Sequence, residues 1–149
     1  MLYVCIALEK DLQIQQEIKR TLQAHNLRST PVRRSVLELI SKRGVALASS
    51  ELEKATKADR ITVYRTLRTF ESSGILHRVQ DATGVDKYAL CGGACSVAGH
   101  HHTHAHFHCT SCEKTSCLNE VKIEAQVLPK GYQINESQLT YSGICPSCN

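Results

Sequence analysis

The sequence has no tryptophan, few aromatic residues and no apolar run that approaches the roughly 20 residues of a membrane-spanning helix. Its apolar start, residues 1–8, lacks a preceding basic segment and meets Glu9, Lys10 and Asp11 at once, which is not the pattern of a signal peptide. These absences argue against an exported or membrane protein. We therefore expect a cytoplasmic protein with no membrane partner, whose eight cysteines bind metal in a reducing compartment instead of forming disulfides.

Acidic residues are missing from the segment that is richest in metal-binding side chains. Six histidines lie between His100 and His108, and no Asp or Glu stands among them. Zinc hydrolases and deaminases keep an open coordination position beside an acidic general base, as in the motifs HExxH and HxE. Because that base is absent, we expect no catalytic residues and no enzyme.

Charge is distributed unevenly along the chain. Residues 1–90 contain 15 Lys and Arg against 10 Asp and Glu, whereas residues 91–149 contain 3 against 4. The net charges are therefore +5 and −1. This split favours a first half that faces nucleic acid and a second half that binds metal, although a net charge of +5 alone fits a solvated basic surface equally well.

Hydrophobic spacing in the first 90 residues predicts several short helices followed by a β-hairpin. The expected elements are a helix over 10–25, a helix from Pro31 that stops at Gly44, a short helix begun by a capping box at Ser50, a helix over 60–73 capped by Asp59, and strands over 75–80 and 85–90 around an Asp-Ala-Thr-Gly turn. This order is typical of a winged helix-turn-helix, whose second motif helix enters the major groove of DNA.

The helix over 60–73 is the candidate DNA-reading helix. Its predicted apolar face consists of Val63, Leu67 and Phe70. Its predicted polar face consists of Thr62, Arg65, Thr66 and Thr69. Many small helical domains share such spacing, so periodicity indicates a winged helix without establishing it.

A stretch of small residues, 91–99, predicts a linker between two domains. We place a winged-helix domain at 1–90 and a second domain at 100–149, which gives an α+β fold. The elements expected in the second domain are strands over 107–110 and 115–118, a short helix over 121–128, and one or two strands within 133–144.

Two CxxC pairs predict a structural zinc site. Cys109 with Cys112 and Cys145 with Cys148 supply four thiolates, which suit a closed tetrahedral site that contributes folding energy. The separation between the pairs exceeds that of a simple zinc ribbon, so the intervening residues must form structure of their own. A redox pair or free thiols are the alternatives, and a single CxxC would have favoured them more.

A second metal site is predicted around His104 and His106, because residues i and i+2 of a strand point to the same face. Further ligands must come from elsewhere, and the candidates are His77 in the first hairpin strand and Cys91 after the second. Such a site would bridge the two domains and make their angle depend on metal. Taken alone, His77 is more typical of an ordinary half-buried side chain and Cys91 of a buried apolar one. The remaining tract, His100–His102, fits weak metal binding best.

Three motifs carry a resemblance to a known family. They are ITVYRTL over Ile61–Leu67, the pattern HxHxxCxxC from His104, and GICPSC over Gly143–Cys148. Over about Leu27–Cys148 the chain resembles the ferric uptake regulator family. The resemblance implies a homodimeric, metal-dependent repressor of double-stranded DNA operators with approximate two-fold symmetry. It also implies an N-terminal winged helix-turn-helix followed by a small α/β dimerisation domain.

The resemblance assigns roles to individual residues as well. It implies that the cysteines of the two CxxC pairs hold structural zinc. It implies that Tyr64 and Arg65 contact DNA, and that Arg28 lies where the family places a basic residue in the minor groove. Thr62, on the same polar face, completes the expected DNA contacts.

The chain also departs from the iron-sensing members of that family. Those members usually have a histidine where Ala46 stands, a glutamate where Ala89 stands and an acidic ligand where Cys117 stands. The acidic residues of peroxide-sensing members are missing too. An auxiliary site of some members would need ligands where Thr103 and Ala105 stand, so we expect no such site.

The ligands that remain resemble those of the zinc uptake regulator branch, in which a cysteine directly after the hairpin joins the His-x-His pair. The predicted sensor set is His77, Cys91, His104 and His106. Thiolate with imidazole in a four-coordinate site suits zinc, whereas ferrous iron takes more oxygen ligands. The residues that could replace one of these ligands are Cys95, His102 and Cys117.

We therefore expect a zinc-sensing repressor with two zinc ions per subunit. Two alternatives stay open. One is a regulator of the same family that senses iron, manganese, nickel or peroxide. The other is a zinc buffer or chaperone, which would account for the spare histidines but not for the basic first half.

Overall fold

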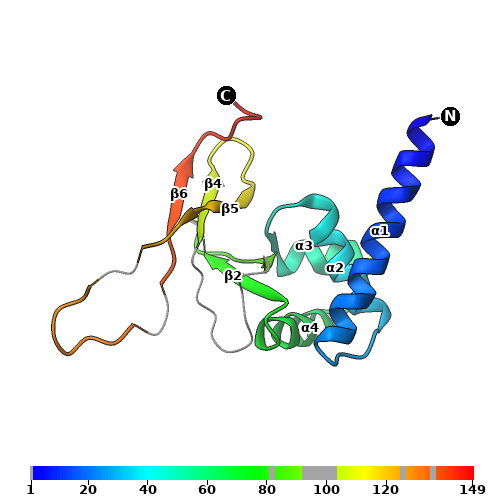
Figure 1. Cartoon of the computed structure of the whole chain (residues 1–149), viewed down its shortest axis with the longest axis horizontal. Helices are drawn as coiled ribbons and strands as arrows, with labels where there is room; N and C mark the ends of the chain where they lie inside the picture. The colour runs from blue at the N-terminus through cyan, green and yellow to red at the C-terminus, as the bar shows by residue number, and fades with distance from the viewer. Residues whose placement is uncertain (1, 81–82, 92–103, 125–126, 135–136) are drawn as a thin grey trace.

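The computed structural model describes residues 2–80, 83–91, 104–124, 127–134 and 137–149 (Figure 1). Four helices lie on one side of a β-hairpin, and a second sheet lies on the other side. The elements are α1 (Leu2–Ala24), α2 (Pro31–Arg43), β1 (Leu47–Ala48), α3 (Ser49–Thr56), α4 (Arg60–Ser72), β2 (Leu76–Gln80), β3 (Asp86–Leu90), β4 (His104–Cys109), β5 (Thr115–Lys122) and β6 (Thr140–Gly143). The predicted α+β class is confirmed.

Local sequence signals fix the ends of α2 and the start of α4 as predicted. The Thr30 hydroxyl accepts a hydrogen bond from the Arg33 amide at 3.3 Å, and proline occupies the first turn. Gly44 ends α2 in the left-handed region, at φ 61°, where a side chain would be strained. The Asp59 carboxylate accepts from the Thr62 amide at 2.9 Å and so caps α4.

Three details of the helices differ from the predictions. The first helix begins at Leu2 instead of residue 10, because no glycine or proline interrupts the sequence before the periodic segment. The third helix begins at Ser49, and the Glu51 carboxylate accepts from the amide of Ala48, so Ser50 is not its cap. Thr66 is only 7% exposed and lies on the buried face of α4, because a period of 3.6 residues places it beside its apolar neighbours.

One hydrophobic core joins the four helices to the hairpin. Each element contributes at least one side chain that is at most 1% exposed: Leu22, Leu37, Leu52, Phe70 and Leu76. Burial of such a side chain contributes about 1.5–3 kcal/mol. The helices and the hairpin of the N-terminal half therefore pack around a single core.

The hairpin is confirmed, and a third strand that the sequence did not reveal extends it. β2 and β3 pair antiparallel from Leu76 with Leu90 to Gln80 with Asp86. The two-residue strand β1 pairs with the other edge of β3, giving the order β1-β3-β2. A strand of two residues is too short to produce a periodic sequence signal. The first two residues of the predicted turn, 81–82, lie outside the described residues.

The C-terminal sheet consists of β4 at the centre, β5 antiparallel on one side and β6 parallel on the other. The short helix predicted over 121–128 is wrong: β5 runs to Lys122, and the described residues beyond it form no helix. Pairing with β4 extends the strand, and Val127 is 98% exposed, so it buries almost none of its side chain against the described residues. The predicted linker lies outside the described residues except for Cys91.

Hydrogen bonds join the C-terminal sheet to the hairpin. The Gln138 side chain donates to the Arg78 carbonyl at 3.1 Å and accepts from the Gln80 amide at 3.3 Å. The Ala46 amide, just before β1, donates to the Thr115 carbonyl at 2.8 Å. None of the helices within the described part of the chain is both long enough and apolar enough to cross a membrane.

Candidate metal centres and DNA-binding face

The four cysteines of the two CxxC pairs come together at the end of the C-terminal sheet, and we call them the four-cysteine group. Their sulfur atoms all lie within 4.8 Å of one another. The Cys112 and Cys145 sulfurs are 3.8 Å apart. Tetrahedral zinc with Zn–S bonds of about 2.3 Å would separate its sulfurs by about 3.8 Å. The group therefore fits zinc in both donor chemistry and spacing.

Parallel pairing of β4 with β6 builds this group from residues that are far apart in the sequence. Cys109 lies opposite Gly143, and the Thr110 amide donates to the Gly143 carbonyl at 2.8 Å. The second CxxC turn follows directly, so the Cys145 amide reaches the Cys109 sulfur at 3.4 Å. The predicted assembly of the four cysteines is present without any bridging disulfide between them.

The thiols of this group differ in acidity. Hydrogen bonds from the backbone amides of Cys112 and then Cys145 lower the pKa of Cys109 to about 6, because they stabilise its thiolate. Hydrogen bonding with the Cys145 and Cys112 side chains raises the pKa of Cys148 to about 12. A cation that binds here therefore meets a Cys109 sulfur that readily forms the thiolate and displaces the proton from Cys148.

A second group, the histidine–cysteine group, consists of His77, His104, His106 and Cys117. One ligand atom from each lies within 4.8 Å of the others, and the three histidines are buried. The Nε2 atom of His77 is 3.1 Å from Nε2 of His106 and 3.6 Å from the Cys117 sulfur. Tetrahedral zinc would separate two nitrogens by about 3.4 Å and a nitrogen from a sulfur by about 3.6 Å. This donor set fits zinc as well.

The histidine–cysteine group bridges the two halves of the molecule. His77 lies on β2, His104 and His106 lie two residues apart on β4, and Cys117 on β5 is the register partner of His106. Burial lowers the pKa of His104, which keeps its imidazole neutral and able to bind metal. The predicted bridging of the halves by one histidine of the hairpin and two of the later strand matches this geometry.

Cys91 lies beside this group but not within it. Its sulfur is 3.6 Å from Nδ1 of His77, the ring nitrogen on the other side from the one that faces His106 and Cys117. Cys117 takes the place that the sequence had suggested for Cys91. The other candidates, Cys95 and His100–His102, lie outside the described residues.

Apolar side chains pack against Cys117 on one side. Ala46, Val79 and Ala89 form a small buried cluster against which Cys117 packs. Ala46 and Ala89 are two of the positions at which the sequence departs from iron-sensing members. In this structure they present methyl groups next to the site, so neither position supplies an oxygen or nitrogen side-chain ligand.

The predicted DNA contacts lie on an open surface. Tyr64 is 54% exposed, Arg65 and Arg28 are exposed, and Thr62 is half-buried. Tyr64 and Arg65 border a hollow of about 920 Å³ between α3, α4 and β3. An exposed aromatic ring and an exposed guanidinium on one helix suit contact with bases and phosphates.

Comparison with known proteins identifies relatives of this chain. A family model described as the ferric uptake regulator family matches residues 24–142. The ferric uptake regulation protein of Synechococcus elongatus is 30% identical over 142 residues, which cover 88% of this chain and 92% of that protein. The protein of the same name from Bacillus subtilis is 25% identical, with 89% and 92% covered.

Solved structures share the fold. A zinc uptake regulator in complex with zinc and DNA aligns with a TM-score of 0.66 at 22% identity, covering 93% of this chain and 94% of its own. A zinc-bound manganese uptake regulator aligns with a TM-score of 0.58 at 17% identity, covering 86% and 98%. At these identities the likeness extends to the fold, and the metal must be argued from the ligands.

Proposed function

We propose, from the premise that the chain belongs to the ferric uptake regulator family of metal-responsive DNA-binding transcriptional regulators, that it is a repressor that senses zinc. One observation carries the proposal: the histidine–cysteine group joins three imidazoles and one thiol from both halves of the molecule. Such a group can make the position of the DNA-binding half depend on metal.

The donor atoms favour zinc over iron or manganese. Three nitrogens and one sulfur match four-coordinate zinc, whereas ferrous iron and manganese take more carboxylate and water oxygens. No carboxylate belongs to the group, and the neighbouring cluster with Ala46 and Ala89 is apolar. The relatives named for ferric uptake make an iron sensor the second candidate.

The residues of the group act by fixing the hairpin. Zinc bound here would supply coordination bonds between β2 and the strands β4 and β5. Because His77 lies on β2, which packs on the same core as α4, holding its ring fixes the reading helix against the C-terminal sheet. In a homodimer this would set the spacing of two α4 helices to that of successive major grooves of an operator with approximate two-fold symmetry.

We infer a separate, structural zinc for the four-cysteine group, which gives two zinc ions per subunit. Four sulfurs complete a tetrahedral zinc site, so no coordination position stays open for exchange with solvent ligands. We also keep the domain limits 1–90, 91–99 and 100–149 as a proposal, since β3 ends at Leu90 and β4 begins at His104. Exposed apolar side chains of the second domain favour a homodimer: Val127, Leu128, Tyr132 and Ile134.

The test is operator binding titrated against buffered zinc, iron and manganese, with the metal content counted per subunit. We expect two zinc ions per subunit and activation by zinc alone. One zinc with activation by iron would reject the zinc assignment. Unchanged operator affinity after removal of only the weaker-bound metal would reject metal sensing at this group.

A further inference from the structure

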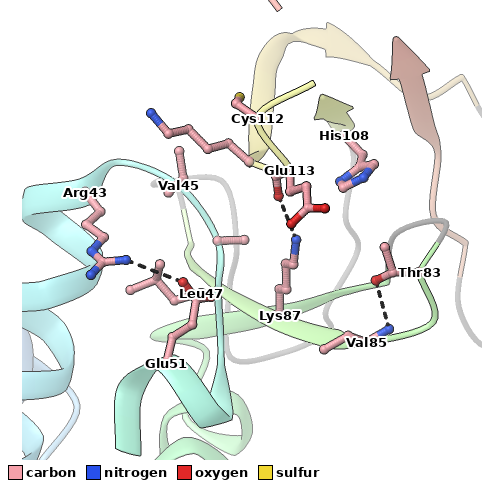
Figure 2. Close-up of a pocket in the computed structure, with 12 residues that line it drawn as sticks. Arg43, Val45, Leu47, Glu51, Thr83, Val85, Lys87, His108, Cys112 and Glu113 are labelled. Atoms are coloured by element: carbon pink, nitrogen blue, oxygen red, sulfur yellow. Dashed lines mark hydrogen bonds and ion pairs between the residues drawn. The ribbon is translucent and has the colours of Figure 1, made fainter. Parts of the chain in front are cut away.

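A cavity of about 830 Å³ lies between the two halves, and Lys87 reaches across it (Figure 2). Its ammonium, on β3, donates to the Glu113 carbonyl at 3.0 Å and to the Thr115 hydroxyl at 3.1 Å. Both acceptors lie at the β4–β5 turn, which also carries Cys112. A cation that donates to a carbonyl and a hydroxyl makes stronger hydrogen bonds than a neutral donor does.

Thr115 accepts the hydrogen bond from Lys87. It is fully buried, and its hydroxyl also lies 3.1 Å from Nδ1 of His108. Its carbonyl accepts from the Ala46 amide at 2.8 Å. Both the side chain and the backbone of Thr115 therefore bond to the DNA-binding half.

The hydrogen bond between Lys87 and Thr115 lies close to the histidine–cysteine group along both β3 and β5. Lys87 is two residues from Ala89, and Ala89 pairs with His77. Thr115 is two residues from Cys117 on β5. Two residues of a strand span about 6.6 Å and point to the same face. Whatever holds Lys87 to Thr115 therefore also holds β2 and β5 at the separation that the group requires.

We propose that Lys87 and Thr115 form a latch that preorganises the histidine–cysteine group for metal. The inference rests on the proposed function, because it assumes that this group binds metal. Neither residue is a ligand; both are positioning residues. The latch holds the two halves together before metal binds to this group, so metal binding costs less conformational entropy. By linkage, metal at the group must in turn tighten the latch.

The first test measures metal affinity by competition with a chelator. Lys87→Met removes the ammonium and keeps the stem, and Thr115→Val removes the hydroxyl at nearly constant volume. We expect each to lower zinc affinity at the histidine–cysteine group about three- to tenfold, which is less than the full contribution of a charge-assisted hydrogen bond because the latch acts on the group only through the strands. The double variant should lose less affinity than the sum of the two single losses, because both substitutions remove the Lys87–Thr115 hydrogen bond.

The second test uses protein whose histidine–cysteine group is empty and whose four-cysteine group keeps its metal. Hydrogen exchange of the Ala46 amide reports whether the halves are docked, because that amide bonds to Thr115. We expect faster exchange in Lys87→Met and in Thr115→Val, and recovery in Thr115→Ser, which keeps the hydroxyl. Lys114→Met removes an equal charge from the same cavity, on the β4–β5 turn that Lys87 contacts, and should change neither exchange nor zinc affinity.

The outcomes separate the latch from the proposed function. Wild-type affinity in Lys87→Met, additive losses in the double variant, or an equal effect of Lys114→Met would each overturn the latch. If instead a variant with His77 replaced retains all the metal of the wild-type protein, the proposed function fails, whereas the exchange of Ala46 still reports the latch. Retained metal at the four-cysteine group and an unchanged melting temperature of the helical half show that each variant is folded.

Discussion

At the scale of single residues, the ring of His77 decides what the histidine–cysteine group can bind. One ring nitrogen, Nε2, faces His106 and Cys117, and the other, Nδ1, faces Cys91. The two cysteines therefore flank the same imidazole from opposite sides. Only the one on the Nε2 side shares a common centre with His104 and His106.

This geometry predicts unequal effects for two matched substitutions. Cys117→Ser removes a ligand and should lower zinc affinity more than Cys91→Ser does. We expect the loss in Cys91→Ser to stay within the about 10- to 100-fold typical of residues that orient a ligand. Chelator competition on both variants measures the difference. A larger loss in Cys91→Ser would return Cys91 to the ligand set that the sequence suggested.

Burial of His104 predicts a pH dependence of stability in protein whose histidine–cysteine group is empty and whose four-cysteine group keeps its metal. Its pKa is lowered from 6.5 in the folded state by burial, so the unfolded chain takes up a proton at a higher pH than the folded one. The free energy of unfolding should therefore decrease as pH falls below about 6.5. Urea unfolding at several pH values should show a weaker decrease in His104→Gln. An identical slope in that variant would rule out His104 as the source.

At the scale of elements, α4 has one face that packs in the core and an opposite face that is open to contact DNA. Val63, Leu67 and Phe70 are buried in the core, while Tyr64 and Arg65 are exposed. The helix can therefore carry base and phosphate contacts without loss of packing. Its Asp59 cap, whose pKa is lowered by hydrogen bonds from Thr62, keeps the helix start ordered next to those contacts.

Substitution on the exposed face should separate DNA binding from metal binding. Tyr64→Ala and Arg65→Ala should each weaken operator binding by about 1–3 kcal/mol if they contact bases, and both should leave zinc content unchanged. Fluorescence anisotropy with operator DNA and metal analysis of the same samples provide the measurement. Tyr141→Ala, which removes an exposed tyrosine from β6, is a matched control for folding. Full operator affinity in both α4 variants would favour the zinc buffer instead.

At the scale of the whole molecule, the two halves differ in what holds them together. The N-terminal half has a large apolar core drawn from four helices and the hairpin. Among the described residues of the C-terminal sheet, the buried hydrophobic ones are Ala105 and Cys109. So little apolar burial suits a domain whose fold depends on metal and on a partner surface.

Removal of metal should therefore unfold the molecule in two parts. A strong zinc chelator that empties the four-cysteine group should abolish the C-terminal sheet and the dimer, while the helical half stays folded. Circular dichroism would then retain the helical signal, and light scattering would report monomers. Simultaneous loss of the helical signal would show that the N-terminal half does not stay folded without the C-terminal sheet.

The sequence by itself determined much of this protein. Caps at Thr30 and Asp59, the apolar period of α4 and the alternation of the hairpin are local signals, and local backbone chemistry is enough to read them. The sequence likewise showed which four cysteines belong together, because no other four cysteines form two CxxC pairs. The His-x-His pair was readable from strand periodicity.

Only the tertiary structure decided the rest, because it depends on which strands pair and in what register. The sequence favoured Cys91 and offered Cys117 only as a replacement, whereas pairing of β5 with β4 places Cys117 opposite His106. The apolar spacing over 121–128 allowed a helix, whereas its first two residues continue β5 as a strand. The link from Lys87 to Thr115 spans 28 residues and arises from docking of the two halves. Pairing and docking are long-range events, and no local sequence pattern encodes them.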